Sequence, residues 1–190
     1  MKIARFVLFL LVIVAVAYPE TESLGMGAFA NTDGAILVAV DAALVNRTLD
    51  NPYVMFVLYV AAKNEPITIA RNDVVMIHNG REYPLPSVRE LRGNYGGGLR
   101  DLDLYGRLGK EGLNASWVRL YRFPDQLNFF PPLSWNSELA VERASAYNYI
   151  GFQTALYFKN PGFSKGDKVL IKVRDHKNPG LTGECGVVLD

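Results

Sequence analysis

The 190-residue chain contains a single cysteine, Cys185, which excludes an internal disulfide bond. Exported domains often use disulfides, but a domain of this length buries enough apolar surface to fold without them. Cys185 lies in the apolar C-terminal segment, and a cysteine in that setting most often packs as a small hydrophobic side chain. We expect Cys185 to be buried; the alternatives are intermolecular pairing and reactivity.

The sequence has no excess of charge of either sign. It carries 20 Lys and Arg residues and 19 Asp and Glu residues, a formal net charge of +1. Lys2 and Arg5 precede an apolar N-terminal run with the pattern of a cleavable export signal. Its removal leaves 18 basic against 19 acidic residues, a net charge of −1. A chain so balanced has no general attraction to polyanions. We therefore expect neither nucleic acid nor an anionic membrane surface to be a partner.

Histidine is almost as scarce as cysteine, with only His78 and His176 present. A zinc site would need both of them close together, with a carboxylate such as Asp175 or Glu184. Both histidines lie next to predicted turns. The sequence favours exposed polar positions for them over metal ligation.

Motifs that carry catalysis are missing. The chain has no Gly-x-Ser-x-Gly elbow and no Gly-x-x-x-x-Gly-Lys loop. Asp101, Asp103 and Glu111 are too few for calcium, which takes six to eight oxygen ligands. Pairing Cys185 with a distant histidine does not make a credible nucleophile and base. We predict that the chain is not an enzyme and uses no metal or cofactor.

The sequence lacks a hydrophobic run long enough to span a bilayer, which takes about 20 residues. Its N-terminus instead has the order of an export signal: basic Lys2 and Arg5, an apolar core from Phe6 to Val14, then Ala15-Val16-Ala17. We predict a signal peptide over residues 1–17 and a secreted or periplasmic mature protein without a stable membrane span. An uncleaved N-terminal anchor is the alternative.

The longest apolar run after this signal is Tyr53–Ala62. It is rich in branched and aromatic side chains, which suit a strand, and it is bounded by Pro52 and by Asn64-Glu65-Pro66. Its alternating side chains predict a central strand covered on both faces. An antiparallel partner is expected over Ile36–Val45, with one buried face.

Further strands are expected on both sides of a hairpin turn at Asn79-Gly80, a pair that tolerates positive φ. The other predicted strands are Ile67–Ala70, Trp117–Phe123, Ile150–Phe158, Lys168–Arg174 and Glu184–Leu189. Residues 137–147 fit a short helix slightly better than an edge strand. This pattern indicates an all-β fold, an antiparallel two-sheet sandwich of eight or nine strands. Its predicted limits are residues 34–190, preceded by a tether over residues 18–33.

Several of these segments together resemble the immunoglobulin-like domains of unknown function found in many secreted bacterial proteins. The resemblance is carried by the apolar strand ending at Lys63-Asn64, by the hairpin from Gly80 to Tyr83, and by Gly166-Asp167 before a late strand. It covers residues 36–86 and 150–190. It implies an immunoglobulin-like sandwich and no catalytic residues.

Residues 89–113 interrupt this pattern with seven glycines between Gly93 and Gly112. Connections in compact domains usually span about 4–6 residues, so a segment this long is predicted to be an inserted loop with a function. Its leucines and tyrosines predict a partly ordered flap over the sandwich. We take Tyr95, Arg100 and Tyr105 as candidate ligand-binding residues. The charged residues Arg100, Asp101, Asp103 and Arg107 are expected to face solvent or a partner.

A second candidate surface is an aromatic cluster that includes both tryptophans of the chain: Trp117, Tyr121, Phe123, Phe129, Phe130 and Trp135. Exposed rings stack on sugars or anchor protein partners, whereas interleaved leucines favour a role in the core. Both alternatives stay open. The predicted function is an exported, non-catalytic binding or protein-interaction domain. The alternative is a carbohydrate-binding module with Trp117, Tyr121 and Trp135 as platforms.

Overall fold

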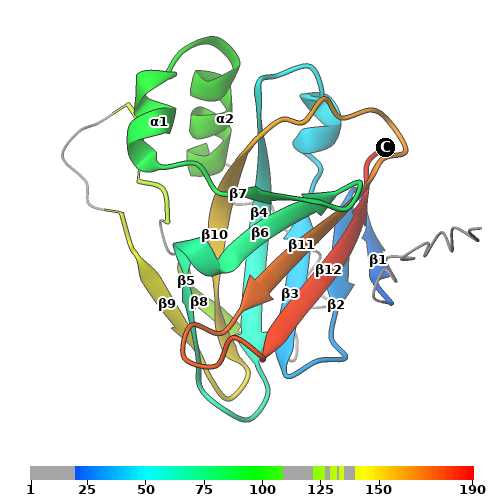
Figure 1. Ribbon diagram of the computed structural model, residues 1–190, viewed down its shortest axis with the longest axis vertical. Coiled ribbons are helices and arrows are strands. Elements are labelled where there is room, and N and C mark those ends of the chain that lie inside the picture. The colour runs from blue at the N-terminus through cyan, green and yellow to red at the C-terminus, as the bar shows by residue number, and fades with distance from the viewer. Residues whose placement is uncertain (1–19, 109–121, 127–128, 132, 135–139) are drawn as a thin grey trace, which may run out of the picture.

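The computed structural model describes residues 20–108, 122–126, 129–131, 133–134 and 140–190. Two β-sheets face each other in these residues (Figure 1), and the expected all-β fold with antiparallel sheets is confirmed. The large sheet has the order β1-β2-β3-β4-β10-β8, and the facing sheet has the order β12-β11-β6-β7. A small third sheet pairs β5 with β9. The described residues form twelve strands, more than the eight or nine expected.

The bounds of the strands are β1 Glu22–Gly25, β2 Ala28–Asn31, β3 Ile36–Asp41, β4 Tyr53–Ala62, β5 Ile67–Ala70, β6 Val74–His78, β7 Arg81–Pro84, β8 Arg122–Gln126, β9 Arg143–Ala146, β10 Ile150–Lys159, β11 Lys168–Arg174 and β12 Thr182–Val188. Short 3₁₀ helices cover Val45–Arg47 and Arg71–Asp73, and the α-helices are α1 Val88–Gly93 and α2 Gly97–Leu108. All named strand pairs are antiparallel except β8 with β10.

Strand β4 lies in the middle of the large sheet, between β3 and β10, as its sequence predicts. Phe56 and Leu58 on one face are fully buried. Burying a side chain of this size stabilises the folded state by roughly 1.5–3 kcal/mol. With side chains of the facing sheet such as Met76 and Ile171, they form the main core between the two sheets.

The large sheet is also covered on part of its other face. A second core gathers there from three neighbouring strands, and its buried members are Ala28, Ala30, Leu37, Ala39, Tyr59 and Ala61. Phe123 of β8 packs edge-to-face on Tyr59, with ring centroids 5.4 Å apart. Strand β3 therefore has two buried faces, and the prediction of one buried face was wrong.

The predicted tether over residues 18–33 contains a hairpin of the large sheet. Strand β1 pairs with β2, which pairs with β3. The hairpin also reaches β12, because Gly186 N–H donates to Thr21 Oγ1 (3.0 Å) and Asn31 Nδ2 donates to the Glu184 carbonyl (2.8 Å). These strands are only four residues long, too short to show a clear alternation in the sequence.

The predicted inserted loop, residues 89–113, contains two helices in its described part. Ser87 caps α1, its Oγ accepting from Glu90 N–H at 3.0 Å. Gly98 permits α2 to lie against Asn51, since a Cβ at Gly98 would stand 2.7 Å from Asn51 Cγ. Figure 1 shows both helices together at the upper left of the sheets.

Two further segments differ from expectation. Residues 143–146 form β9, whose Ala144 and Ala146 are buried, so the strand alternative holds where a short helix was slightly favoured. Strand β8 begins at Arg122 and continues to Gln126, into a stretch expected to be irregular. The Asn79-Gly80 hairpin is confirmed, with φ of 50° and 75° at its two turn residues.

Candidate binding surfaces

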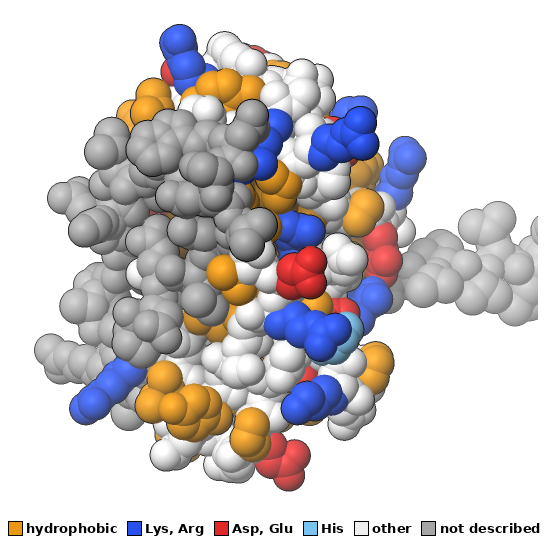
Figure 2. Space-filling view, turned by 90° about the vertical axis from the view of Figure 1, so that its left-hand side faces the viewer, with side chains coloured by type: hydrophobic (Ala, Val, Ile, Leu, Met, Phe, Trp, Pro, Cys, Tyr) orange, Lys and Arg blue, Asp and Glu red, His pale blue; other side chains and the backbone are white. Residues whose placement is uncertain are grey.

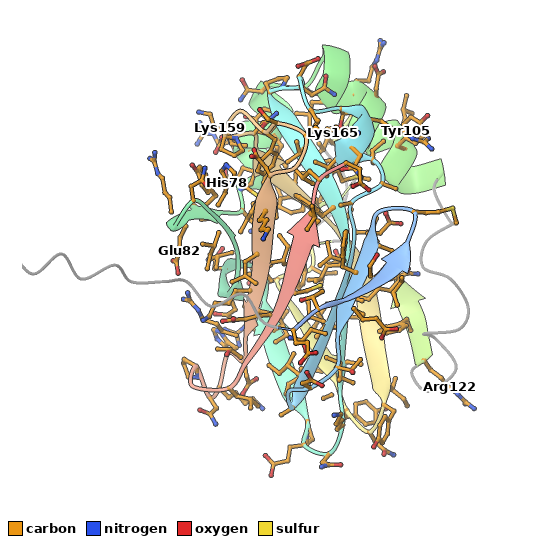
Figure 3. The ribbon with its side chains drawn as sticks, turned by 90° about the vertical axis from the view of Figure 1, so that its right-hand side faces the viewer. His78, Glu82, Tyr105, Arg122, Lys159 and Lys165 are labelled. Carbon is orange, nitrogen blue, oxygen red and sulfur yellow. The ribbon has the colours of Figure 1, made fainter. Side chains whose placement is uncertain are left out.

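The outer face of α2 carries two of the predicted binding residues. Arg100 and Asp101 are exposed and form an ion pair, with Nε 3.6 Å from Oδ1. One turn later, Leu104 and Tyr105 are 43% and 53% exposed. The spacing of four residues aligns Arg100 with Leu104 and Asp101 with Tyr105 along the helix. Figure 3 shows Tyr105 on α2.

The inner face of α2 holds a buried carboxylate. Leu99, Leu102 and Asp103 share this face by their spacing of three and four residues, and only 3% of Asp103 is exposed. Its Oδ2 accepts from the Tyr95 hydroxyl at 3.4 Å, and its Oδ1 accepts from Leu133 N–H at 3.3 Å. The expectation that Asp103 faces solvent was wrong, because the helix turns it inward together with the two leucines.

Tyr95, the third candidate in this segment, is half-buried and packs against the main core. Its hydroxyl contact with Asp103 makes it a support for α2. A similar pair holds α1, where the Tyr53 hydroxyl lies 3.4 Å from Glu90 Oε1. Burial, followed by the charge of Glu90 and this hydrogen bond, raises the pKa of Tyr53. The Tyr53–Glu90 pair thus joins α1 to β4, and the Tyr95–Asp103 pair holds α2 to the segment that precedes it.

The aromatic cluster is described only in part, since Trp117, Tyr121 and Trp135 lie outside the described residues. Phe129 and Phe130 are buried. Phe129 packs on Phe152 with centroids 5.9 Å apart, and Phe130 packs edge-to-face on Tyr157 at 5.3 Å. For these two phenylalanines the core alternative holds.

A turn that the sequence reading overlooked joins β9 to β10. Asn148 and Tyr149 occupy its two central positions with φ of 45° and 63°. Tyr147 and Ile150 exchange two backbone hydrogen bonds of 2.9 and 2.8 Å across it. Tyr147 is 50% exposed and Tyr149 41%. Asn148, at the first central position, was the available signal, because asparagine is favoured there. The glycine that usually follows it is absent, since Tyr149 takes the second central position.

This turn lies at one end of the molecule. Figure 2, which looks at the left-hand side of Figure 1, shows hydrophobic side chains gathered at the lower end, where Figure 1 places the β9–β10 turn. Figure 3 shows Arg122, the first residue of β8, projecting at the same end. We call Tyr147, Asn148 and Tyr149 the tyrosine turn.

The two histidines take part in separate polar networks. His78 is buried, which corrects the expectation of exposure, and its ring packs edge-to-face on Phe163 at 5.1 Å. His176 Nδ1 lies 2.9 Å from Asp73 Oδ2, and the backbone N–H of His176 donates to the Thr68 carbonyl at 2.7 Å. Within the described residues, no group of three or more His, Cys, Asp or Glu side chains is arranged to hold a metal.

No family model matches the chain, and the searches of curated proteins and of solved structures gave no match. Among the described residues, no helix is long and apolar enough to cross a membrane.

Proposed function

We propose that the chain is an exported, non-catalytic interaction domain that binds a protein partner through the outer face of α2. The observation that carries this proposal is the exposure of Leu104 and Tyr105 side by side on a helix, next to the charged Arg100 and Asp101. Tyrosine and arginine are enriched at the energetically important centres of protein interfaces. When a partner covers an exposed pair of large apolar side chains, the removal of their surface from water stabilises the complex.

The support beneath α2 favours the same proposal. Leu99 and Leu102 belong to the main core, and Asp103 bonds to two residues outside the helix. A helix held in this way presents its outer side chains with little remaining freedom of the backbone. Binding then costs less conformational entropy than binding by a flexible loop would.

Export is supported by the N-terminal sequence alone. Its basic start, apolar core and Ala15-Val16-Ala17 site have the order of a cleavable signal. We propose that residues 1–17 are removed and that the mature protein is secreted or periplasmic.

The strand order supports the immunoglobulin-like relationship as a proposal about the fold. In such sandwiches, the first two strands and the fifth share one sheet, and the third, sixth and seventh share the other. Here β3, β4 and β10 are neighbours in the large sheet, and β6, β11 and β12 are neighbours in the facing sheet. On this assignment the two helices and β8 and β9 are additions before β10, and the β1–β2 hairpin is an N-terminal addition.

A photo-crosslinking experiment tests the protein-interaction proposal. A photoreactive phenylalanine analogue replaces Tyr105 in the full chain, expressed in cells that export it. A matched control places the analogue at Lys165, which is exposed on the loop before β11. We expect a discrete protein adduct from position 105, absent from position 165 and lost when Leu104→Ser is added. Absence of an adduct at position 105, or the same adduct from both positions, contradicts the proposal.

A further inference from the structure

We propose that the tyrosine turn is a carbohydrate-binding site, with the rings of Tyr147 and Tyr149 as a platform for a neutral pyranose oligosaccharide. This inference concerns the opposite end of the molecule from α2 (Figure 1). It does not depend on the protein-interaction proposal. It is carried by the backbone of the turn, by the size of its exposed surface and by the polar side chains around it.

The backbone of Tyr149 is strained for a residue of its kind. Its φ of 63° lies in the left-handed region, which glycine and asparagine adopt readily and bulky side chains rarely do. In a two-residue turn of this type, glycine is the usual residue at that position. Strained residues of this kind gather at functional sites. Tyr149 is 41% exposed, so part of the strained residue is accessible to a ligand.

The turn is held on both sides, so its rings need little ordering before they bind. Tyr149 N–H donates to the Ala62 carbonyl at 2.8 Å, and Arg122 N–H donates to the Tyr149 carbonyl at 2.9 Å. These bonds attach the turn to the end of β4 and the start of β8. A rigid platform keeps the entropic cost of binding low.

The size of the exposed surface suits a small, flat ligand. A tyrosine ring contributes roughly 150–250 Å² when it is fully buried. Tyr147 is 50% exposed and Tyr149 41%, so each residue leaves part of its surface open to a ligand. A sugar ring, with an apolar face of C–H groups and hydroxyls at its edge, matches one aromatic ring in area.

The polar side chains near the turn suit the hydroxyls of a neutral sugar. The segment Lys63–Pro66 runs beside the turn, because Ala62 bonds to Tyr149 and Ile67 pairs with Ala146. It carries the exposed Asn64 and Glu65. Asn148 and Arg122 are exposed as well. The charges of Arg122 and Glu65 balance each other, and these two side chains and the two amides donate or accept hydrogen bonds.

Titration calorimetry with defined hexasaccharides tests this site on the mature-length protein. The neutral probes are cellohexaose, chitohexaose, xylohexaose and mannohexaose, and the acidic probe is the hexamer of galacturonic acid. We expect saturable binding of at least one neutral probe. Tyr147→Ala should weaken it by about tenfold or more, as the loss of one stacked ring implies. Tyr149→Gly should weaken binding similarly, because it removes the second ring while glycine adopts the positive φ of the turn without strain.

Two controls separate this proposal from the one on α2. Tyr105→Ala removes an exposed aromatic ring elsewhere and should leave sugar affinity unchanged, and Tyr147→Ala should leave the photo-adduct at position 105 intact. The proposal is overturned if no neutral probe binds, if only the acidic probe binds, or if both tyrosine-turn variants bind as the wild type does. A Tyr149→Gly protein that keeps its affinity would show that the ring has no part in binding.

Discussion

At the scale of single residues, the partly buried carboxyl of Asp41 is the clearest source of pH dependence. Asp41 ends β3, and its Oδ1 accepts from Ala43 N–H at 2.8 Å. Burial raises its pKa above the ordinary 3.8, and the hydrogen bond offsets part of that rise. The native state therefore binds a proton at Asp41 more tightly than the unfolded state does. The contribution of Asp41 to the free energy of unfolding falls as the pH rises through the interval above 3.8.

The substitution Asp41→Asn tests this sign, because asparagine keeps an oxygen that accepts from Ala43 but cannot ionise. We expect the free energy of unfolding of the variant, relative to the wild type, to increase as the pH rises from about 3.8 and then to level off. Urea denaturation at a series of pH values measures the difference. Parallel curves, or a gap that grows toward acid, would refute the assignment.

Asp41 also acts on a neighbouring tyrosine. The pKa of Tyr59 is raised to about 12, first by burial and then by the charge of Asp41. Asp41→Asn therefore lowers the pKa of Tyr59 as well, although burial keeps it above its ordinary value of 10.

Some residue positions follow from the sequence and others depend on the tertiary structure. Cys185 is buried as expected, and burial raises its pKa to about 12. A cysteine in an apolar strand usually packs in the core as a small hydrophobic side chain. Asp103 is different, because its buried position depends on Tyr95 and on Leu133, which lies 30 residues away. The turn at Tyr149 was not predicted for a related reason. Such turns usually have glycine at this position, and here a tyrosine takes the positive φ.

At the scale of elements, α2 is a helix with a glycine-rich sequence that packs against the main core. Each glycine inside a helix costs about 1 kcal/mol relative to alanine, so the sequence alone argues against a helix. Leu99 and Leu102 are nevertheless buried in the main core. Their burial offsets the poor helical propensity, which is why the segment was expected to be a loop and is a helix.

Two leucines of this helix make a matched pair for measurement. Leu102 is 1% exposed, whereas Leu104, two residues later, is 43% exposed. Leu102→Ala leaves a cavity and should lower the free energy of unfolding by roughly 2–5 kcal/mol. Leu104→Ala removes an exposed side chain and should change it by less than about 0.5 kcal/mol. Urea denaturation of both variants gives the comparison, and equal losses would mean that α2 is not packed as described.

The predictability of an element depends on its length and on where its partners lie. The ten-residue β4 and the β6–β7 hairpin carry their own pattern or turn signal, and both are confirmed. Strands β1, β2 and β9 have four residues each. Four residues hold few alternations, and these three segments lack the β-branched side chains that mark the equally short β5, Ile67–Ala70. Their strand conformation comes from pairing with distant segments, which a local pattern does not contain.

At the scale of the whole molecule, the large sheet and the facing sheet approach each other closely where β12 passes β3. Gly183 of β12 stands against Ile36 and Val38 of β3, and Figure 1 shows β12 beside β3 and β2. Asn31 and Thr21 also form hydrogen bonds with the backbone of β12. This contact joins the N-terminal hairpin, the central sheet and the last strand. The closeness of the sheets there depends on a residue without a side chain.

Gly183→Ala should therefore disturb the whole sandwich. A Cβ at this position would stand 2.7 Å from Val38 Cγ2 and 2.8 Å from the Ile36 carbonyl oxygen. The carbonyl belongs to a paired strand and cannot turn away as a flexible side chain would, so the sheets must separate. We expect the free energy of unfolding to fall by about 1–3 kcal/mol, as overpacking of a core does. Gly180→Ala is the control, since its nearest neighbour, Asn178 Oδ1, would be 3.4 Å away. Urea denaturation should show a clear loss for the first variant and little change for the second, and a Gly183→Ala protein as stable as the wild type would mean that the sheets are less closely packed at this point.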